Sequence, residues 1–240
     1  MTDLNNNIDR LFTTEIIPAL AAEGIRIVTY AALGQEDRSE LERVFEESIF
    51  PVLTPLAVDP SHPFPFISDL SLNLAVLLYD PIAGAQRFAR VKIPPNVPRF
   101  IQLADGQRFV PIEQIVSHHL GRLFGGLDVV DASTFRVTRS ADLAVEEEEA
   151  NDLLQAIESV LRYRQRAAQA VRLEVEAGVS EHVLELLLHG LQLTHDEVYT
   201  RHAQLGLAGL WSVYGLDRPE LKDPVSKPTT QPRLAESSGK

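Results

Sequence analysis

The stretch that decides the fold is FPVLTPLAVDPSHPFPFISDLSLNLAV, residues 50–76, which holds five of the chain's fifteen prolines. Each proline fixes its own φ and biases the preceding residue toward extended geometry, so we predict a rigid, non-helical connector. A solvated linker would be polar. This one is apolar, so it should press against a protein surface. The rings of Phe64 and Phe66 are then either buried there or face a partner domain. It continues into Leu72–Leu78, whose nearly uninterrupted apolar residues predict a strand buried on both faces.

Helical and strand patterns alternate on both sides of this stretch. Apolar spacing and capping residues predict helices over 3–23, where Pro18 should kink or divide the helix, over 37–49, 112–123 and 146–168, and after Ser180 and Thr194. Alternating residues and the Asp105-Gly106 turn predict strands at 25–28, 89–93, 99–103, 108–110, 133–139 and 171–176. A short helix ending near Gly215 closes the pattern. We therefore predict an α+β fold, with a mixed, largely antiparallel sheet covered by helices.

Composition narrows the possible partners and compartments. The formal net charge of −12 argues against a nucleic-acid-binding surface, because phosphate contacts need clustered Lys and Arg. The chain has no cysteine, which excludes disulfides and thiolate chemistry and fits a reducing compartment. No apolar run reaches the roughly 20 residues of a membrane helix, and MTDLNNNIDR lacks the features of a signal peptide. We expect a cytoplasmic protein without a transmembrane segment.

His62 is a candidate catalytic residue because it lies in the proline-rich stretch with Asp59 and Asp69 nearby. A histidine held on a rigid loop can carry a proton at neutral pH. The alternative is a side chain that hydrogen-bonds the turn it occupies, and we favour that alternative.

The other histidines are candidate metal ligands. His118 and His119 are adjacent on a predicted helix, so they cannot share one of its faces. The two pairs spaced by seven residues, which can each share a face, are His182 with His189 and His195 with His202. Neither pair is accompanied by carboxylates in a zinc-binding pattern, so we interpret them as surface or capping residues.

Charged clusters offer two further hypotheses. The run Glu146–Glu149 could bind a cation, but a solvated helix N-terminus explains it without a ligand. A phosphate-binding face across paired strands could be formed by Arg87, Arg90, Lys92 and Arg99. On an acidic protein we favour ordinary solvent-facing strand positions for these four residues.

The sequence contains no self-contained active site. It lacks the GxxxxGK[ST] phosphate loop, the GxGxxG dinucleotide fingerprint and the GxSxG nucleophile elbow. Trp211 and Tyr214 remain as two aromatic candidates, either as interface anchors or as core residues of the last helix. We leave both readings open and assign no catalytic, cofactor-binding or metal-binding residue.

The amino-acid sequence of residues 50–76 resembles the middle, or head, region of the bacterial type-1 polyphosphate kinase family. Segments that match the family in the same order are FTTEIIPALAAEGIRI at 12–27, FRVTRSADL at 135–143, EEEEANDLLQAIE at 146–158, VRLEVEAGV at 171–179 and YGLDRPELKDP at 214–224. The resemblance extends over nearly the whole chain and is loosest at 201–211. It implies a helical entry segment at 1–50, the head domain at 51–217 and a linker at 218–240.

The resemblance also implies a function for the longer parent protein. The full enzyme would move the γ-phosphate of ATP reversibly onto polyphosphate through a phosphohistidine, using ATP and Mg²⁺. Its nucleotide and magnesium contacts and its phosphohistidine would lie in a preceding helical domain and two following catalytic domains. The resemblance therefore implies that this chain supplies scaffolding and homodimer contacts, is inactive alone, and lies in the cytoplasm or at the periphery of a membrane. The alternative is a free-standing interaction module that pairs with a separately encoded catalytic half.

Overall fold

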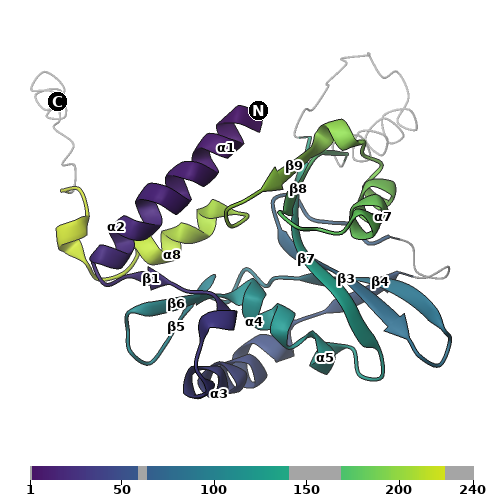
Figure 1. Cartoon of the computed structure of the whole chain (residues 1–240), viewed down its shortest axis with the longest axis horizontal. Coiled ribbons are helices and arrows are strands. Elements are labelled where there is room, and N and C mark those ends of the chain that lie inside the picture. Colours follow the sequence, from purple (N-terminus) through teal and green to yellow (C-terminus); the bar gives the residue numbers. More distant parts are fainter. Residues whose placement is uncertain (1, 59–63, 141–168, 225–240) are drawn as a thin grey trace, which may run out of the picture.

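The computed structural model describes residues 2–58, 64–140 and 169–224, which form two sheets and their covering helices (Figure 1). The larger sheet has the strand order β2-β4-β3-β7-β8-β9, and the smaller sheet has the order β1-β6-β5. The larger sheet consists of β2 (Pro55–Val58), β3 (Leu72–Asp80), β4 (Ala85–Lys92), β7 (Asp128–Arg139), β8 (Ala170–Glu176) and β9 (Val198–Arg201). The smaller consists of β1 (Arg26–Ile27), β5 (Phe100–Gln102) and β6 (Arg108–Pro111). All strand pairs are antiparallel except β8–β9 and β1–β6.

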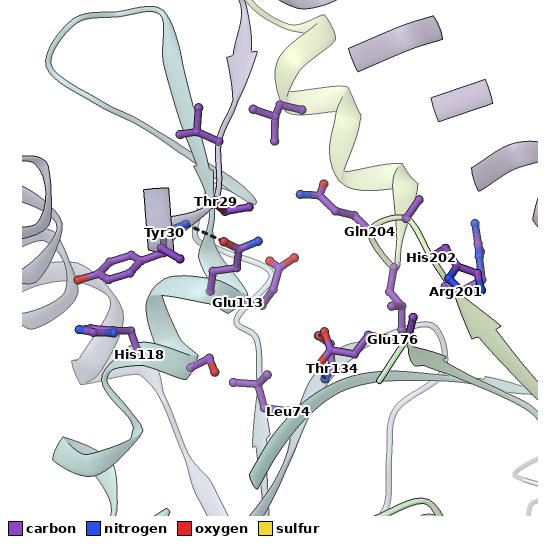
Figure 2. A pocket seen from close by; sticks show the side chains of 18 of the residues that line it. Thr29, Tyr30, Leu74, Glu113, His118, Thr134, Glu176, Arg201, His202 and Gln204 are labelled. Carbon is purple, nitrogen blue, oxygen red and sulfur yellow. Dashed lines mark hydrogen bonds between the residues drawn. The ribbon is translucent and has the colours of Figure 1, made fainter. Parts of the chain in front are cut away.

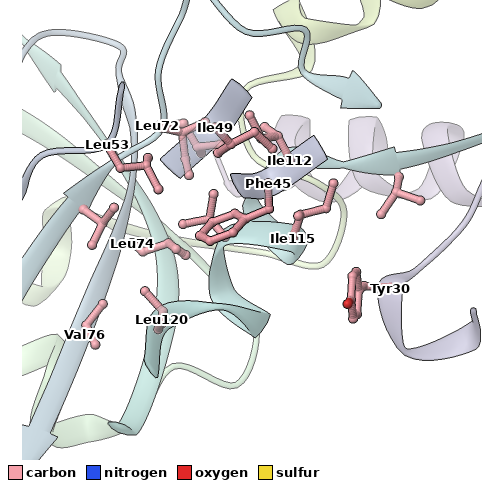
Figure 3. Close-up of a cluster of buried hydrophobic side chains, with 14 of the residues drawn as sticks. Tyr30, Phe45, Ile49, Leu53, Leu72, Leu74, Val76, Ile112, Ile115 and Leu120 are labelled. Carbon is pink, nitrogen blue, oxygen red and sulfur yellow. The ribbon is translucent and has the colours of Figure 1, made fainter. Parts of the chain in front are cut away.

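Strand β3 is the central element of the fold, and its first seven residues are all buried. Its side chains alternate between two apolar clusters, as the period of two in a strand requires. Leu74 and Val76 point into a cluster with helices α3 (Gln35–Val44) and α4 (Ile112–His118) (Figure 3). Leu77 points into a second cluster with α7 (Glu181–Leu191) on the other face. The predicted α+β fold, a largely antiparallel sheet covered by helices, is confirmed (Figure 1).

The helix predicted over 37–49 is confirmed as α3, which continues into a π-helical turn at Phe45–Ile49. Leu41, Phe45 and Ile49 are fully buried against the sheet (Figure 3). Residues four apart lie on the same face of a helix, so this spacing supplies the apolar stripe that covers β3.

The N-terminal helical segment continues past Pro18, and a π-helical turn directly before this proline divides it into two α-helices, in agreement with the predicted division. It consists of α1 (Thr2–Leu11), a π-helical turn at Phe12–Ile16, and α2 (Ile17–Ala22). The π-helical turn lies directly before Pro18, whose missing N–H cannot bond the preceding turn. Gly24 has φ +80° and ends the helix, as expected of a residue that tolerates the left-handed region.

The described part of the proline-rich stretch begins with a 3₁₀ turn at Phe50–Val52, and residues 59–63 lie outside the described ranges. It then forms β2, which pairs with β4 at the edge of the larger sheet, a position where proline is tolerated. Phe64 stacks on Phe88 with the ring centroids 5.7 Å apart. The Phe66 ring is 63% exposed, so burial within the described structure is wrong for this ring, and contact with a partner domain stays a prediction.

The structure confirms some of the remaining predicted helices and contradicts others. Ser180 caps α7 by accepting a hydrogen bond from the Val183 amide. The capping box of Thr194 exists, but it closes only a 3₁₀ turn at His195–Glu197 that leads into β9, so the predicted helix there is wrong. The helix predicted over 112–123 is interrupted, because α4 ends at His118 and α5 (Leu120–Leu123) follows it. Near the C-terminal end of the described residues, α8 (Trp211–Tyr214) follows a 3₁₀ turn at Leu207–Leu210. The predicted helix over 146–168 lies outside the described residues. Within the described ranges, no helix has both the length and the apolarity needed to cross a membrane.

Candidate functional site

A cavity of about 760 Å³ lies between the N-terminal helical segment and the larger sheet (Figure 2). Its helical wall includes Phe12 and Ile17, and its sheet wall includes Leu74 of β3. Its polar lining includes Glu113 from the first turn of α4, Glu176 from the end of β8, and Gln204 from the loop after β9. The basic side chains Arg38, His118, Arg201 and His202 also line it. We call this space the carboxylate cavity.

Glu113 is the most deeply buried carboxylate of the cavity, with its side chain 8% exposed. The Arg99 guanidinium donates to Oε1 of Glu113 at 2.5 Å and to the Leu205 carbonyl oxygen at 3.1 Å. The second oxygen of Glu113, Oε2, is buried without a hydrogen-bond partner among the described residues. Burial raises the pKa of the Glu113 carboxyl above its ordinary value, and the nearby charge of Glu176 adds to this rise, although the charge of Arg99 opposes it.

Glu176 faces Glu113 across the cavity, and Gln204 lies between them at one side (Figure 2). The Glu176 carboxylate accepts hydrogen bonds from the Thr134 amide at 2.8 Å and from the Thr134 hydroxyl at 2.5 Å. Both donors are neutral, and no ion pair of Glu176 is found within the described ranges. The Gln204 Oε1 atom is buried and also lacks a donor there. Glu113 and Gln204 therefore each present a buried acceptor oxygen without a donor to the cavity, while Arg38, another lining residue, has a buried Nε donor without an acceptor among the described residues.

A buried network of ion pairs lies beside this cavity and attaches α1 to the sheet. Arg201 of β9 donates to Asp9 of α1 at 2.5 Å and to Glu174 of β8 at 2.8 Å. Glu174 also accepts from Arg136 at 2.8 Å and from Arg172 at 2.9 Å. Asp9, Glu174 and Arg201 are each at least nine-tenths buried. Buried charges require such pairing, so the network fixes where α1 lies.

The pKa values of both acids in this network are lowered. Burial opposes ionisation of Asp9, but the hydrogen bonds from Arg201 and from the His202 amide outweigh burial and hold the pKa of Asp9 below its ordinary value. Burial likewise opposes ionisation of Glu174, and the charges of its arginine neighbours hold the pKa of Glu174 below its ordinary value. Both carboxyls are therefore ionised at neutral pH.

The four basic residues proposed for a phosphate-binding face do not act together. Arg87 pairs with Asp80 at 2.8 Å, and Lys92 donates to the Ser68 hydroxyl at 3.2 Å. Arg99 pairs with Glu113. The favoured reading of all four as solvent-facing is wrong for Arg90, which is 6% exposed and donates to the Asn73 side chain.

The two adjacent histidines differ, because His119 is a buried packing residue whereas His118 is exposed and lines the carboxylate cavity. His119 is buried, its ring stacks on Phe45 with centroids 4.4 Å apart, and its Nδ1 lies 2.8 Å from the Ile115 carbonyl oxygen. His118 lies against the Tyr30 ring at 4.3 Å, and partial burial lowers the pKa of His118 below its ordinary value.

The remaining described histidines are dispersed over the surface. His195 contacts Glu185 at 3.0 Å, and the exposed side chains of His182, His189 and His202 lie on α7 and after β9. In the described part of the chain, no three histidine or carboxylate side chains are grouped for metal binding.

Several predicted site residues lie outside the described ranges, namely His62, Asp59 and the run 146–149. Asp69 is described, and its carboxylate accepts a hydrogen bond from the Arg139 amide at 2.8 Å. This contact ties the end of the proline-rich stretch to β7.

Trp211 and Tyr214 are exposed by 73% and 54%, so the interpretation as core residues is wrong. Their rings meet edge to face at 5.5 Å, whereas Val213 between them is the buried residue of α8. The reading as interface anchors stays open.

The sequence did not reveal the charged residues that the structure buries, above all Asp9, Glu113, Glu174 and Arg201. The one available signal was a charged residue inside an apolar pattern, such as Glu113 between Ile112 and Ile115. Such a position does not show which distant residue will be the partner.

Comparisons with known proteins now add to this geometry. The family model described as polyphosphate kinase middle domain matches residues 36–213, well over half of the chain. A polyphosphate kinase of Mycobacterium marinum is 48% identical over 237 residues, covering 95% of this chain and 32% of that protein. A polyphosphate kinase of Streptomyces coelicolor is 48% identical over 225 residues, covering 94% of this chain and 30% of that protein.

The fold also matches a solved structure. The crystal structure of polyphosphate kinase from Porphyromonas gingivalis superimposes with a TM-score of 0.68 at 24% identity, covering 95% of this chain and 33% of that one. The chain thus spans about a third of the length of the curated relatives it matches. On the strength of the family match, this chain belongs to the polyphosphate kinase middle-domain family.

Proposed function

We propose that this chain is the scaffolding and dimerising middle domain of a polyphosphate kinase and is inactive alone. The whole protein would transfer the γ-phosphate of ATP reversibly to polyphosphate through a phosphohistidine in another domain, with ATP and Mg²⁺ bound there. The observation that carries this proposal is the extent of the match, which covers 95% of this chain but only 32% of the Mycobacterium marinum relative.

The ion pairs of the described residues support a structural role. Phosphoryl transfer needs cationic side chains that are free to hold phosphate oxygens in the transition state. Arg99, Arg136, Arg172 and Arg201 are instead paired with buried carboxylates of the chain itself. These arginines stabilise the fold and leave phosphate binding to other parts of the enzyme.

A chimera tests the proposal. The matching third of the Mycobacterium marinum relative is replaced by this chain, and polyphosphate synthesis from labelled ATP is measured for the chimera and for the isolated chain. We expect synthesis by the chimera only, with light scattering giving a dimer for the isolated chain. Synthesis by the isolated chain would overturn the assignment of catalysis elsewhere, and a monomer at every concentration would overturn the dimerising role.

Exposed aromatic residues favour a second candidate, a free-standing module that pairs with a separately encoded catalytic half. Trp211 and Tyr214 together present a large apolar surface, and such residues anchor protein interfaces. Because Trp211 is the sole tryptophan, its fluorescence reports on this surface directly.

Titration of a separately expressed catalytic half distinguishes the two candidates. Pairing should shift Trp211 emission to shorter wavelength, and Tyr214→Ala should weaken the pairing at least about tenfold while leaving the urea midpoint unchanged. A Tyr79→Ala variant is a matched control, because Tyr79 is exposed on β3 away from α8. An unchanged emission spectrum at saturating concentrations would rule out this module.

A further inference from the structure

We propose that the carboxylate cavity binds a small organic ammonium compound with an apolar body. Its ammonium group is held by the Glu113 and Glu176 carboxylates and by the Gln204 amide oxygen. The inference rests on the contents of the cavity and does not depend on the role proposed above.

The polar atoms of the cavity call for hydrogen-bond donors. Glu113 Oε2 and Gln204 Oε1 are both buried and without partners in the described part of the chain. Buried acceptors without donors are unfavourable, so a ligand that brings donors gains free energy there. A primary ammonium supplies three donors and no acceptor, which fits these two atoms together with the Glu176 carboxylate.

The charge around Glu113 and Glu176 also favours a positively charged ligand. The Glu176 carboxylate is bonded only by the neutral donors of Thr134. Arg201 also lines the space, but its guanidinium is already shared between Asp9 and Glu174. Arg38 also lines the cavity, beside Tyr30, and its Nε atom is buried without an acceptor in the described part of the chain, so the preference for a cation is confined to the part around Glu113, Glu176 and Gln204. There an anionic ligand such as phosphate would meet the unpaired acceptors and be repelled, whereas a cation is attracted.

The size and the walls of the cavity favour an organic cation over a bare metal ion. Its volume of about 760 Å³ lies within the range of small-molecule pockets. Its apolar wall includes Phe12, Ile17 and Leu74, which can pack against the hydrocarbon part of a ligand. Divalent ions prefer a close shell of several oxygen ligands, and the described residues offer no group of three histidine or carboxylate ligands.

The helical wall has an irregularity at the same place. The π-helical turn Phe12–Ile16 borders the cavity, and such turns occur often at binding sites. It displaces the helix register by one residue, so that Phe12 and Thr13 both line the cavity.

Chemical shifts of backbone and side-chain amides test the proposal on the whole chain. Butylammonium is the probe, butan-1-ol is its neutral counterpart of similar size, and Mg²⁺ is a third titrant. We expect saturable shifts of the Thr134 amide and the Gln204 side-chain amide with butylammonium, and at least about tenfold weaker binding of butan-1-ol. Equal affinity for the two organic probes would overturn the proposal, as would shifts caused by Mg²⁺ alone.

Glu176→Gln is the decisive variant, because it removes the charge and keeps an oxygen for the Thr134 amide. It should weaken butylammonium at least about tenfold. Glu185→Gln, on the exposed surface of α7, should leave the affinity unchanged. If Glu176→Gln does not fold, Gln204→Ala replaces it, and unchanged affinity in whichever variant folds would overturn the proposal.

Discussion

At the scale of single residues, Arg201 determines how the N-terminal helix is held. It lies between Asp9 and Glu174, and all three side chains are at least nine-tenths buried. Glu174 retains Arg136 and Arg172 if Arg201 is lost, but Asp9 has no other ion pair in the described structure. Asp9 would then be a buried charge without a charged partner among the described residues, and would keep the hydrogen bond from the His202 amide at 2.7 Å.

We predict that Arg201→Met lowers the free energy of unfolding by about 3–5 kcal/mol, because breaking a buried ion pair leaves an uncompensated charge. Urea titration monitored by circular dichroism measures the loss. Arg43→Met is the matched control, because Arg43 and its partner Glu47 are both more than half exposed. That control should cost less than about 1 kcal/mol. Equal losses in the two variants would contradict the prediction.

The same carboxyls predict how stability depends on pH. Folding lowers the pKa values of Asp9 and Glu174 below their ordinary values of 3.8 and 4.5. Their stabilising contribution is therefore complete above these ordinary values and is lost as the pH falls through the lower pKa values of the folded state. We expect unfolding free energy to fall more steeply below pH 4 in the wild type than in Arg201→Met. Parallel curves from urea titrations at successive pH values would count against this account.

At the scale of elements, the end of the proline-rich stretch packs on α7 through one close approach. A Cβ atom built on Gly190 would lie 2.2 Å from the Phe64 ring. Glycine inside a helix normally costs up to about 1 kcal/mol relative to alanine. Here it makes room for an aromatic ring that also stacks on Phe88.

We predict that Gly190→Ala destabilises the wild type, and that the same change stabilises the Phe64→Ala variant by up to about 1 kcal/mol. The effect of Gly190→Ala on the free energy of unfolding reverses its sign because, in the Phe64→Ala variant, no ring occupies the space of the new methyl group. Urea midpoints of the four proteins in this double-mutant cycle provide the measurement. Phe66→Ala serves as the control, because its ring is largely exposed and lies only against Arg139. A Gly190→Ala change of the same sign in both backgrounds would refute the steric explanation.

At the scale of the whole molecule, α1 buries polar residues, whereas the sheet buries apolar ones. The rest of the N-terminal helical segment packs through the apolar side chains of Phe12 and Leu20. Asn5 and Asp9 are the buried residues of α1, while Leu4 and Leu11 are exposed. The described molecule therefore combines a cooperative apolar core around β3 with a helix attached by charges.

We predict that Asp9→Asn raises amide hydrogen exchange in residues 2–22 at least about tenfold and leaves β3 unchanged, because only the helix depends on this charge. Exchange followed by mass spectrometry measures both regions in one experiment. Asp3→Asn is the control, because Asp3 is an exposed residue of the same helix. Faster exchange in both β3 and the helix would show instead that they open as one unit.

The sequence by itself determined the parts of this protein that depend on local spacing. The apolar run Leu72–Leu78 could only be a strand buried on both faces, and Asp105-Gly106 supplies a turn with the positive φ that Gly106 adopts. Ser180 marks the start of α7 because its side chain bonds an amide three residues away. The order of such segments also carried the family resemblance.

Only the tertiary structure decided which charges are buried and where the cavity lies. Asp9 and Arg201 are 192 positions apart in the chain, and Glu113 and Glu176 come from α4 and β8. Local spacing predicts neither juxtaposition. The charges of Asp9 and Arg201 are stable inside the protein only after the sheet has brought the two residues together. For the same reason, the face of α1 that is buried is its polar one, which the apolar periodicity of residues 3–23 does not predict.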